Sequence, residues 1–353
     1  IHQKVCFLAF TEGGTMATPF SHTVLSRWLK EHEKDLKPPI CNKLLSAGQL
    51  KIMFVGGKEA NDRGDYHIED GEEFFYMMKG DMCLKVLEKG KHRDIIIKEG
   101  HTFLLPPRIP HSPQRPANSL GLVIERERQP GDMDALQWFV KGTTDVLWRQ
   151  TFLCSDLGKD LVKVVKNFKA SYEGKTGKKR PKGGNLNDDV KPIMPLSRPL
   201  DCKNTLADPL AIDGWVKSNE ESLKKGFVDL CRGKDFQIQV ACGSLKTEPI
   251  THSSEAFYYL VRGKAELKES SSSFKVSMAD SSIVVIAPRT KHFLLLGENT
   301  LLMTLTWPNA PQEDCNVMTP GEAPRLERES VYANFEENGE LKLDDFGERT
   351  DVS

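Results

Sequence analysis

Paired cysteines are missing from this chain of 353 residues, although it contains eight cysteines. The lack of any Cys-x-x-Cys motif argues against a zinc knuckle and against a thioredoxin-like redox site. Single cysteines such as Cys83, which lies between Met82 and Leu84, usually serve as small buried apolar side chains. We therefore expect reduced thiols and no metal site built from cysteine.

Long apolar runs and a strong net charge are also missing. The apolar run Val5–Phe10 is too short to cross a bilayer and lacks the flanks of a signal peptide. No later run approaches the roughly 18 uninterrupted apolar residues of a membrane helix. The net charge of −1 provides no basic field for nucleic acid. We expect a cytoplasmic, globular protein that binds neither membranes nor nucleic acids.

The chain does contain a group of metal-ligand side chains between residues 63 and 115. His67, Glu73 and His111 offer two imidazoles and one carboxylate, a donor set that suits Fe(II), Mn(II), Ni(II) or Zn(II). When such ligands occupy one face of an octahedron, the other face stays open for substrate and O2, as in non-haem iron oxygenases.

Turn residues near these side chains predict how the side chains meet. The segment 69–71, Glu-Asp-Gly, has the composition of a hairpin turn, which would place His67 and Glu73 on adjacent strands. A second hairpin is predicted over residues 82–98. Three prolines with fixed φ then lead to His111, which is expected on a distant strand of the same sheet.

This pattern resembles the two cupin motifs. The first motif is G-x5-H-x-H-x3,4-E-x6-G, and Glu73 with Gly80 fits its second half. That spacing, together with the alternation of side chains along a strand, selects Glu73 over Glu72 as the inward-facing carboxylate. The second motif, G-x5-P-x-G-x2-H-x3-N, is matched at Gly100, Pro106 and His111.

Three positions depart from these motifs. The first motif carries two histidines, but here only His67 is present, and Glu69 stands near the position of the other. In the second motif, Arg108 replaces the Gly and Arg115 replaces the terminal Asn. A three-ligand cupin with an arginine after the last histidine is a narrower class than cupins at large.

Six sequence blocks between Pro39 and Arg126 narrow the resemblance to one family: PPICNKLL, KIMFVGG, DYHIEDGEEFFY, GDMCLKV, LLPPRIPHSPQR and GLVIER. In order and spacing they resemble the 3-hydroxyanthranilate 3,4-dioxygenase family. The resemblance implies a mainly β fold, a bicupin made of two jelly-roll (double-stranded β-helix) barrels with bridging helices.

The resemblance also implies roles for individual residues. It places the iron ligands at His67, Glu73 and His111, and hence one Fe(II) per chain. Arg63 corresponds to the arginine near the O2 and substrate site. Arg115 corresponds to the arginine that grips the substrate carboxylate with a planar, always charged fork. Glu125 corresponds to the acid that contacts the polar ring substituents and can take up a phenolic proton. Glu73 also lies among the expected substrate contacts.

These roles imply an Fe(II)-dependent enzyme that cleaves 3-hydroxyanthranilate with O2 to 2-amino-3-carboxymuconate semialdehyde, in tryptophan degradation through kynurenine toward quinolinate and NAD. A monomer of the longer, animal type is expected. One alternative is a non-catalytic metal-binding cupin that binds a small aromatic acid. Another is an isomerase-type cupin with Glu73 or Glu125 as the base. The pairing of Arg115 with Glu125 favours the dioxygenase, because it suits a zwitterionic aromatic acid beside an open metal.

The second half of the chain repeats the first. EAFYYLVRGKAELKE parallels EEFFYMMKGDMCLKV, and VIAPRTKH parallels LPPRIPH, which indicates a duplication. In the repeat, Ala256, Ile250 and His292 stand at the positions of Glu73, His67 and His111. His252 and Glu255 lie close enough in the sequence to rebuild a site, but a metal-free barrel is the favoured prediction.

Helical spacing of apolar residues predicts helices within Ser21–Lys34, with Ser21 as the N-cap, and within Asp132–Ala170. The expected organisation of the chain is an N-terminal extension and helix (1–36), a catalytic cupin (37–130), a helical bridge and linker (131–200), a degenerate second cupin (201–307) and an acidic C-terminal tail (308–353).

Overall fold

The computed structural model describes residues 19–37, 41–60, 63–181 and 192–311. Residues 1–18 of the predicted N-terminal extension, residues 182–191 of the predicted bridge and linker, and most of the predicted acidic tail therefore lie outside the described residues. Mainly antiparallel strands fill the described ranges, with few helices.

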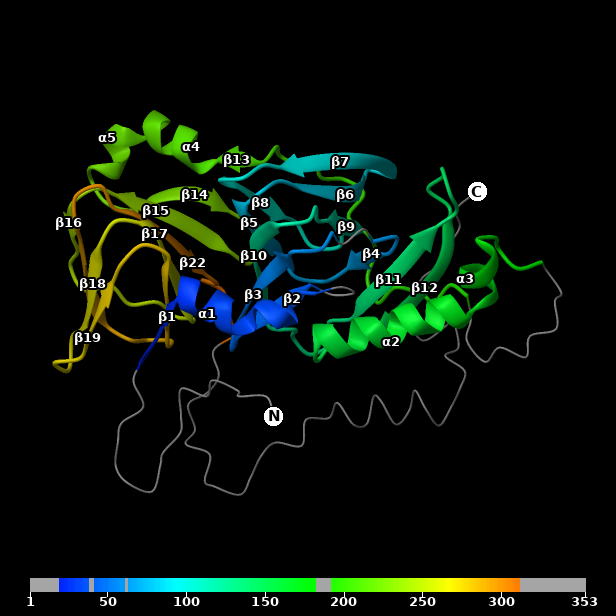
Figure 1. Ribbon diagram of the computed structural model, residues 1–353, viewed down its shortest axis with the longest axis horizontal. Helices are drawn as coiled ribbons and strands as arrows, with labels where there is room; N and C mark the ends of the chain where they lie inside the picture. Colours follow the sequence, from blue (N-terminus) through cyan, green and yellow to red (C-terminus); the bar gives the residue numbers. More distant parts are fainter. Residues whose placement is uncertain (1–18, 38–40, 61–62, 182–191, 312–353) are drawn as a thin grey trace, which may run out of the picture. The chain divides into compact units, whose positions relative to one another are not determined.

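The first barrel consists of two sheets of antiparallel strands (Figure 1). Phe75 and Met77 of one sheet pack against Leu84 and Ile95 of the other, which fills the barrel with apolar side chains. In order, one sheet contains β13 (Leu210–Ala211), β8 (His101–Leu105), β5 (Glu73–Lys79), β10 (Ser119–Arg126), β3 (Leu50–Gly57) and β2 (Asn42–Ala47). The other contains β12 (Val146–Phe152), β11 (Asp134–Phe139), β4 (Tyr66–Ile68), β9 (His111–Gln114), β6 (Met82–Glu88) and β7 (Lys91–Ile97).

The second barrel has the same plan, and its two sheets enclose a core that includes Tyr258, Leu267 and Leu294. One sheet contains β1 (Phe20–Val24), β20 (Ser282–Ile286), β17 (Ala256–Arg262), β22 (Leu301–Thr306), β15 (Gln237–Cys242) and β14 (Val228–Arg232). The other contains β16 (Leu245–Lys246), β21 (His292–Leu296), β18 (Ala265–Glu269) and β19 (Lys275–Met278). The expected mainly β architecture of two barrels is confirmed.

The two barrels exchange strands and share a core. Strand β1 precedes the first barrel in sequence but pairs with β20 of the second, and β13 pairs with β8 of the first. Side chains alternate along each strand, so Phe74 points out of the first barrel while Phe75 points into it. Phe74 meets Phe257 and Leu305 of the second barrel in one apolar cluster.

The predicted N-terminal helix is shorter than expected. Helix α1 covers Leu25–His32, followed by a 3-10 turn at Glu33–Asp35, and Ser21 lies in strand β1 instead of capping the helix. The reason is tertiary: Phe20 is buried in the core of the second barrel, and pairing with β20 extends residues 20–24.

The helical prediction for Asp132–Ala170 is right only for its second half. Helix α2 covers Leu157–Ala170, and the Asp156 side chain caps it by accepting the backbone N–H of Lys159. Residues 134–152 instead form β11 and β12, on which α2 packs (Figure 1). Both strands are largely buried, so the polar–apolar alternation that identifies a strand is lost.

Short helices complete the description: α3 (Tyr172–Thr176) after α2, and α4 (Ile212–Ser218) with α5 (Glu220–Leu223) before the second barrel. None of the helices in the described ranges has both the length and the apolar character needed to cross a membrane.

The shared core predicts that the two barrels unfold together. Phe257→Ala, in the second barrel, is expected to cost about 3–5 kcal/mol, because it opens a cavity in the cluster that both barrels line. Urea unfolding followed by circular dichroism and by tryptophan fluorescence should give one coincident transition at lower urea. Leu295→Ala, at an exposed position, is the control. Two separate transitions would contradict the prediction.

Candidate metal and substrate site

The candidate site is built from two cross-strand pairs, one from each sheet of the first barrel. His67 on β4 lies directly opposite His111 on β9, and Glu73 on β5 lies directly opposite Glu125 on β10. All four side chains are buried. The structure therefore pairs His67 with His111 and Glu73 with Glu125, but the three predicted ligands His67, Glu73 and His111 do not form one group whose ligand atoms all lie within 4.8 Å of one another.

The predicted hairpin between His67 and Glu73 is wrong. Strands β4 and β5 belong to different sheets, and residues 69–72 cross from one sheet to the other. Of the three predicted ligands, only the two histidines share a sheet. The second predicted hairpin is confirmed as β6 and β7, with Met82 opposite Ile97.

Each histidine has one ring nitrogen tied to a partner. The Nδ1–H of His111 donates to the carbonyl of Ile109 at 3.0 Å, and the Nε2–H of His67 donates to the Asp134 carboxylate at 2.8 Å. Such partners fix the tautomer and the ring orientation of metal-binding histidines, and they leave the other ring nitrogen free as a ligand.

The buried oxygens of this site fit a cation. Glu73 Oε2 and Glu69 Oε1 are buried and have no hydrogen-bond donor among the described residues. The Nε2 atom of His111 lies 2.9 Å from Glu73 Oε2. Because Nδ1 already carries the donated proton, these two atoms both present lone pairs, and their approach needs a shared proton or a cation.

Glu69 lies close to both cross-strand pairs of the site, the histidine pair and the glutamate pair. Ligand atoms of His67, Glu69 and His111 lie within 4.8 Å of one another, and so do those of Glu69, Glu73 and Glu125. Glu69 is thus a further possible ligand, at the motif position where the second histidine of a cupin would stand. Its other oxygen, Oε2, is 2.8 Å from Arg128, and Glu73 Oε2 faces His111, so Glu69 and Glu73 are both candidates for the third ligand.

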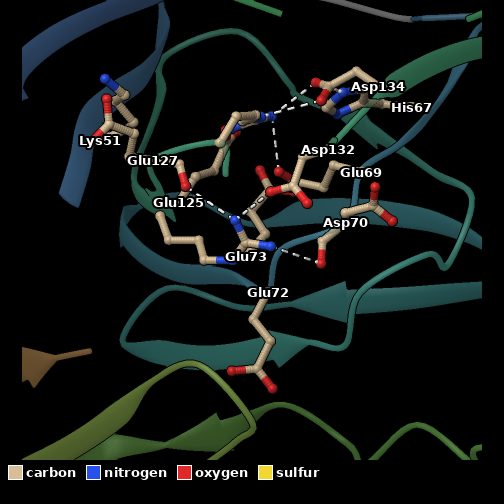
Figure 2. A network of polar contacts seen from close by, with 12 residues as sticks. Lys51, His67, Glu69, Asp70, Glu72, Glu73, Glu125, Glu127, Asp132 and Asp134 are labelled. Atoms are coloured by element: carbon tan, nitrogen blue, oxygen red, sulfur yellow. Dashed lines mark hydrogen bonds and ion pairs between the residues drawn. The ribbon is translucent and has the colours of Figure 1, made fainter. Parts of the chain in front are cut away.

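Arg128 holds the carboxylates of the site together. Its guanidinium donates hydrogen bonds to the Asp134 carboxylate at 2.8 and 3.1 Å. It also forms ion pairs with Glu69, at 2.8 Å, and with Glu125; Figure 2 shows this group of carboxylates. The sequence analysis missed Arg128 and Asp134. The only local sign of them is the charged run ERER that begins at Glu125.

Burial sets the protonation of these carboxylates. It raises the pKa of Glu69 well above its usual range, with the charge of Glu125 acting in the same direction, and it raises the pKa of Glu125. Burial acts the same way on Asp134, but the Arg128 guanidinium and the His67 hydrogen bond outweigh it and depress that pKa. Asp134 therefore stays ionised beneath His67.

The two predicted substrate arginines lie in different environments. Arg115 is buried, and its Nε has no hydrogen-bond partner in the described part of the chain. Burial lowers the Arg115 pKa to about 10, so the side chain still carries its charge at neutral pH. The Arg63 guanidinium is held by Asp65, with Nε–Oδ distances of 3.2 and 3.3 Å. Glu125 pairs with Arg128, and both Arg115 and Glu125 are buried.

The corresponding position of the second barrel holds a hydrogen-bonded chain. His292 Nδ1–H donates to the Thr290 carbonyl, so its Nε2 accepts from the Tyr258 hydroxyl at 3.1 Å. Tyr258 in turn accepts from His252 Nε2 at 2.9 Å. Glu255 points elsewhere and accepts the backbone N–H of Leu50, so it does not rebuild a ligand set with His252.

Comparison with known proteins identifies the family. Residues 19–169 match the family model described as 3-hydroxyanthranilic acid dioxygenase. The 3-hydroxyanthranilate 3,4-dioxygenase of Homo sapiens is 39% identical over 261 residues, which cover 73% of this chain and 87% of the human protein. The enzyme of that name from Nematostella vectensis is 44% identical over 243 residues, 68% of this chain and 83% of that protein.

This chain belongs to the 3-hydroxyanthranilic acid dioxygenase family. Membership reaches beyond the predicted Pro39–Arg126, since the family match includes β1, α1 and most of α2. Among solved structures, a point mutant of salicylate 1,2-dioxygenase from Pseudoaminobacter salicylatoxidans superposes with a TM-score of 0.52 at 8% identity, over 81% of this chain and 83% of that one. This likeness supports the cupin barrel fold alone.

Removal of the Arg128 charge, which pairs with three buried carboxylates, should destabilise the metal-free protein. We predict that Arg128→Gln costs about 3–5 kcal/mol of unfolding free energy, because it leaves several carboxylates buried without a counter-charge. Urea unfolding measures this cost. The control is Arg262→Gln, which breaks an exposed ion pair with Asp213 and should cost at most about 1 kcal/mol. Equal costs would contradict the prediction.

The histidine of the second barrel should make the protein acid-sensitive. Burial, helped by His292, lowers the pKa of His252 from 6.5 to about 4. The unfolded chain therefore binds the proton more readily, and stability present above pH 6.5 is lost as the pH falls toward 4. We predict that His252→Gln removes up to about 3 kcal/mol of this loss. Urea midpoints between pH 8 and 4 test this, and equal slopes for variant and wild type below about pH 6.5 would contradict it.

Proposed function

We propose that this chain is an Fe(II)-dependent 3-hydroxyanthranilate 3,4-dioxygenase. It would open the ring of 3-hydroxyanthranilate with O2 to give 2-amino-3-carboxymuconate semialdehyde, in tryptophan degradation through kynurenine toward quinolinate and NAD. The observation that carries the proposal is a buried arginine, Arg115, whose Nε has no hydrogen-bond partner among the described residues, in the barrel that also contains His67, His111 and Glu73. Family membership supports the same activity.

His67, Glu73 and His111 are the residues proposed to hold the iron, one ion per chain. Four buried carboxyl groups, those of Glu69, Glu73, Glu125 and Asp134, lie close together, and a divalent cation would stabilise their ionised forms. When bound, Fe(II) supplies the redox chemistry that lets O2 react with a closed-shell aromatic ring.

The side chains around the ligands would bind and orient the substrate. Arg115 has a charged, planar guanidinium that suits a carboxylate, and its buried Nε has no hydrogen-bond partner in the described part of the chain. Glu125 is an acceptor for the amino or hydroxyl group, and burial, which raises its pKa, makes it a base able to keep the proton that it takes up. Arg128 holds the Glu125 carboxylate in place, and Arg63, itself held by Asp65, supplies a fixed positive charge near the substrate.

The proposal includes two features that come from the sequence: a monomeric active unit, which the resemblance implies, and a cytoplasmic location, which we expected from the lack of long apolar runs. Light scattering during size-exclusion chromatography tests the first.

Oxygen consumption is the direct test of the proposed reaction. Protein loaded with Fe(II) without air, mixed with 3-hydroxyanthranilate and then exposed to air, should consume one O2 per substrate as the ultraviolet band of the semialdehyde appears. Glu73→Gln should abolish turnover and weaken metal binding. Glu69→Gln should retain the metal if Glu73 is the third ligand, and the opposite result would reassign that ligand to Glu69.

The same assay decides between the alternatives. A wild-type protein that binds 3-hydroxyanthranilate but consumes no oxygen would be the non-catalytic metal-binding cupin. Conversion of a substrate without oxygen, with loss of activity in Glu125→Gln, would favour the isomerase.

Arg115 should govern substrate affinity. Arg115→Met is expected to raise KM about tenfold to a hundredfold, because hydrogen bonds to charged groups contribute about 1.5–3 kcal/mol each. Arg115→Lys keeps the charge but loses the fork, and should recover only part of this affinity. Steady-state kinetics measure both variants, with Arg262→Met, at an exposed ion pair, as the control. An unchanged KM in Arg115→Met would remove Arg115 from the substrate site.

A further inference from the structure

The carboxylate of Glu72, the residue before the ligand Glu73, is buried in the second barrel. It accepts three consecutive backbone N–H groups, from Lys234 at 2.6 Å and from Asp235 and Phe236 at 2.9 Å each. The turn that receives it is closely fitted, since a Cβ atom on Gly233 would lie 2.2 Å from Glu72 Oε1. Nothing in the proposed reaction uses this carboxylate.

The second barrel makes a reciprocal contact with the first. Glu255 is buried and accepts the backbone N–H of Leu50 at 2.9 Å. A Cβ atom on Gly48 would lie 2.0 Å from Glu255 Oε1. The repeat EEFFY and EAFYY places Glu72 and Glu255 at matching positions, so the duplication kept both glutamates.

The residue that follows each glutamate differs. Strand alternation sends Glu72 toward the other barrel and Glu73 into its own barrel. After Glu255 the inward residue is Ala256, which is not a ligand. Only one of the two matching contacts therefore ends next to the candidate metal site.

The turn 233–236 also contacts β10, the strand that contains Glu125. Asp235 accepts the backbone N–H of Glu72 at 3.2 Å and the Nε–H of Arg126 at 3.0 Å. The Arg126 guanidinium also lies 5.5 Å from the ring of Trp307. Glu73 and Glu125, which face each other across β5 and β10, are thus each next to a residue held by the second barrel (Figure 2 shows Glu72 below Glu73).

We propose that Glu72 is a positioning residue, and that the second barrel, through the turn 233–236, sets the place of the Glu73 carboxylate. Residues 69–72 cross between sheets, so no hairpin turn fixes the start of β5. The three N–H bonds to Glu72 fix it instead. The inference rests on the proposed function, because it assigns Glu73 to the metal, and it gives the second barrel a role in metal binding without a metal of its own.

The test compares Glu72→Gln with the matched control Glu255→Gln in the full-length chain. Both variants remove one buried inter-barrel carboxylate, and both should lower the urea midpoint. Glu72→Gln should also raise the dissociation constant for cobalt(II) about tenfold, the lower end of the effect of altering groups that orient ligands. It should change the visible cobalt(II) spectrum, which reports ligand geometry. Glu255→Gln should keep the wild-type constant and spectrum.

A second pair of variants leaves the carboxylates of Glu72 and Glu255 in place. Gly233→Ala pushes into Glu72 from the second barrel, and Gly48→Ala pushes into Glu255 from the first. Gly233→Ala should weaken cobalt(II) binding and Gly48→Ala should not. This pair decides the matter if the glutamine variants fail to fold.

Equal cobalt(II) constants and spectra within both pairs would overturn the inference and reduce Glu72 to a structural contact. That outcome differs from failure of the proposed function, in which the wild-type chain itself would not bind cobalt(II) or would not consume oxygen after loading with Fe(II).

Discussion

The structure depends on buried negative charge that has to be balanced inside a small barrel. Two facing sheets each contribute a cross-strand pair, His67 with His111 and Glu73 with Glu125, at one place in the interior. The carboxylates of Glu69 and Asp134 add to the charge, and Arg128 alone contacts three of the four acids. Such a cluster is costly unless its charge is balanced, so a cation bound at the candidate site would couple metal binding to folding.

The second barrel completes this arrangement from outside. The two large sheets pack back to back through an apolar cluster, and the glutamates that precede β5 and β17 reach across it in opposite directions. Duplication explains the symmetry of these contacts. It also explains why Glu255 persists where Ala256 stands at the position of Glu73: the contact between barrels and the candidate metal site use consecutive residues that point to opposite faces, so one can be lost without the other.

Sequence reasoning succeeded where short spacing sets the outcome. The repeat predicted the second barrel that the structure contains, and the cupin spacings selected His67, Glu73 and His111, whose role as ligands stays a proposal. It failed where a segment is paired by a distant partner. Residues 69–72 look like a hairpin turn but cross between sheets, and residues 134–152 have helical spacing but lie between buried strands and α2. Ser21 seemed to cap a helix, yet β20 draws it into a sheet.

The residue types of the site, their spacing and the presence of a repeat follow from the amino-acid sequence alone, because these are properties of neighbouring residues. Only the tertiary structure decides which other groups contact these site residues. Asp134 lies 67 residues from His67 in the chain, and the turn at Lys234 lies 162 residues from Glu72. Arg128 is close to Glu125 in sequence but reaches Glu69 only through the fold. Hydrogen bonds and ion pairs act over about 3 Å in space, so partners that are distant in the sequence become visible only when the chain has folded.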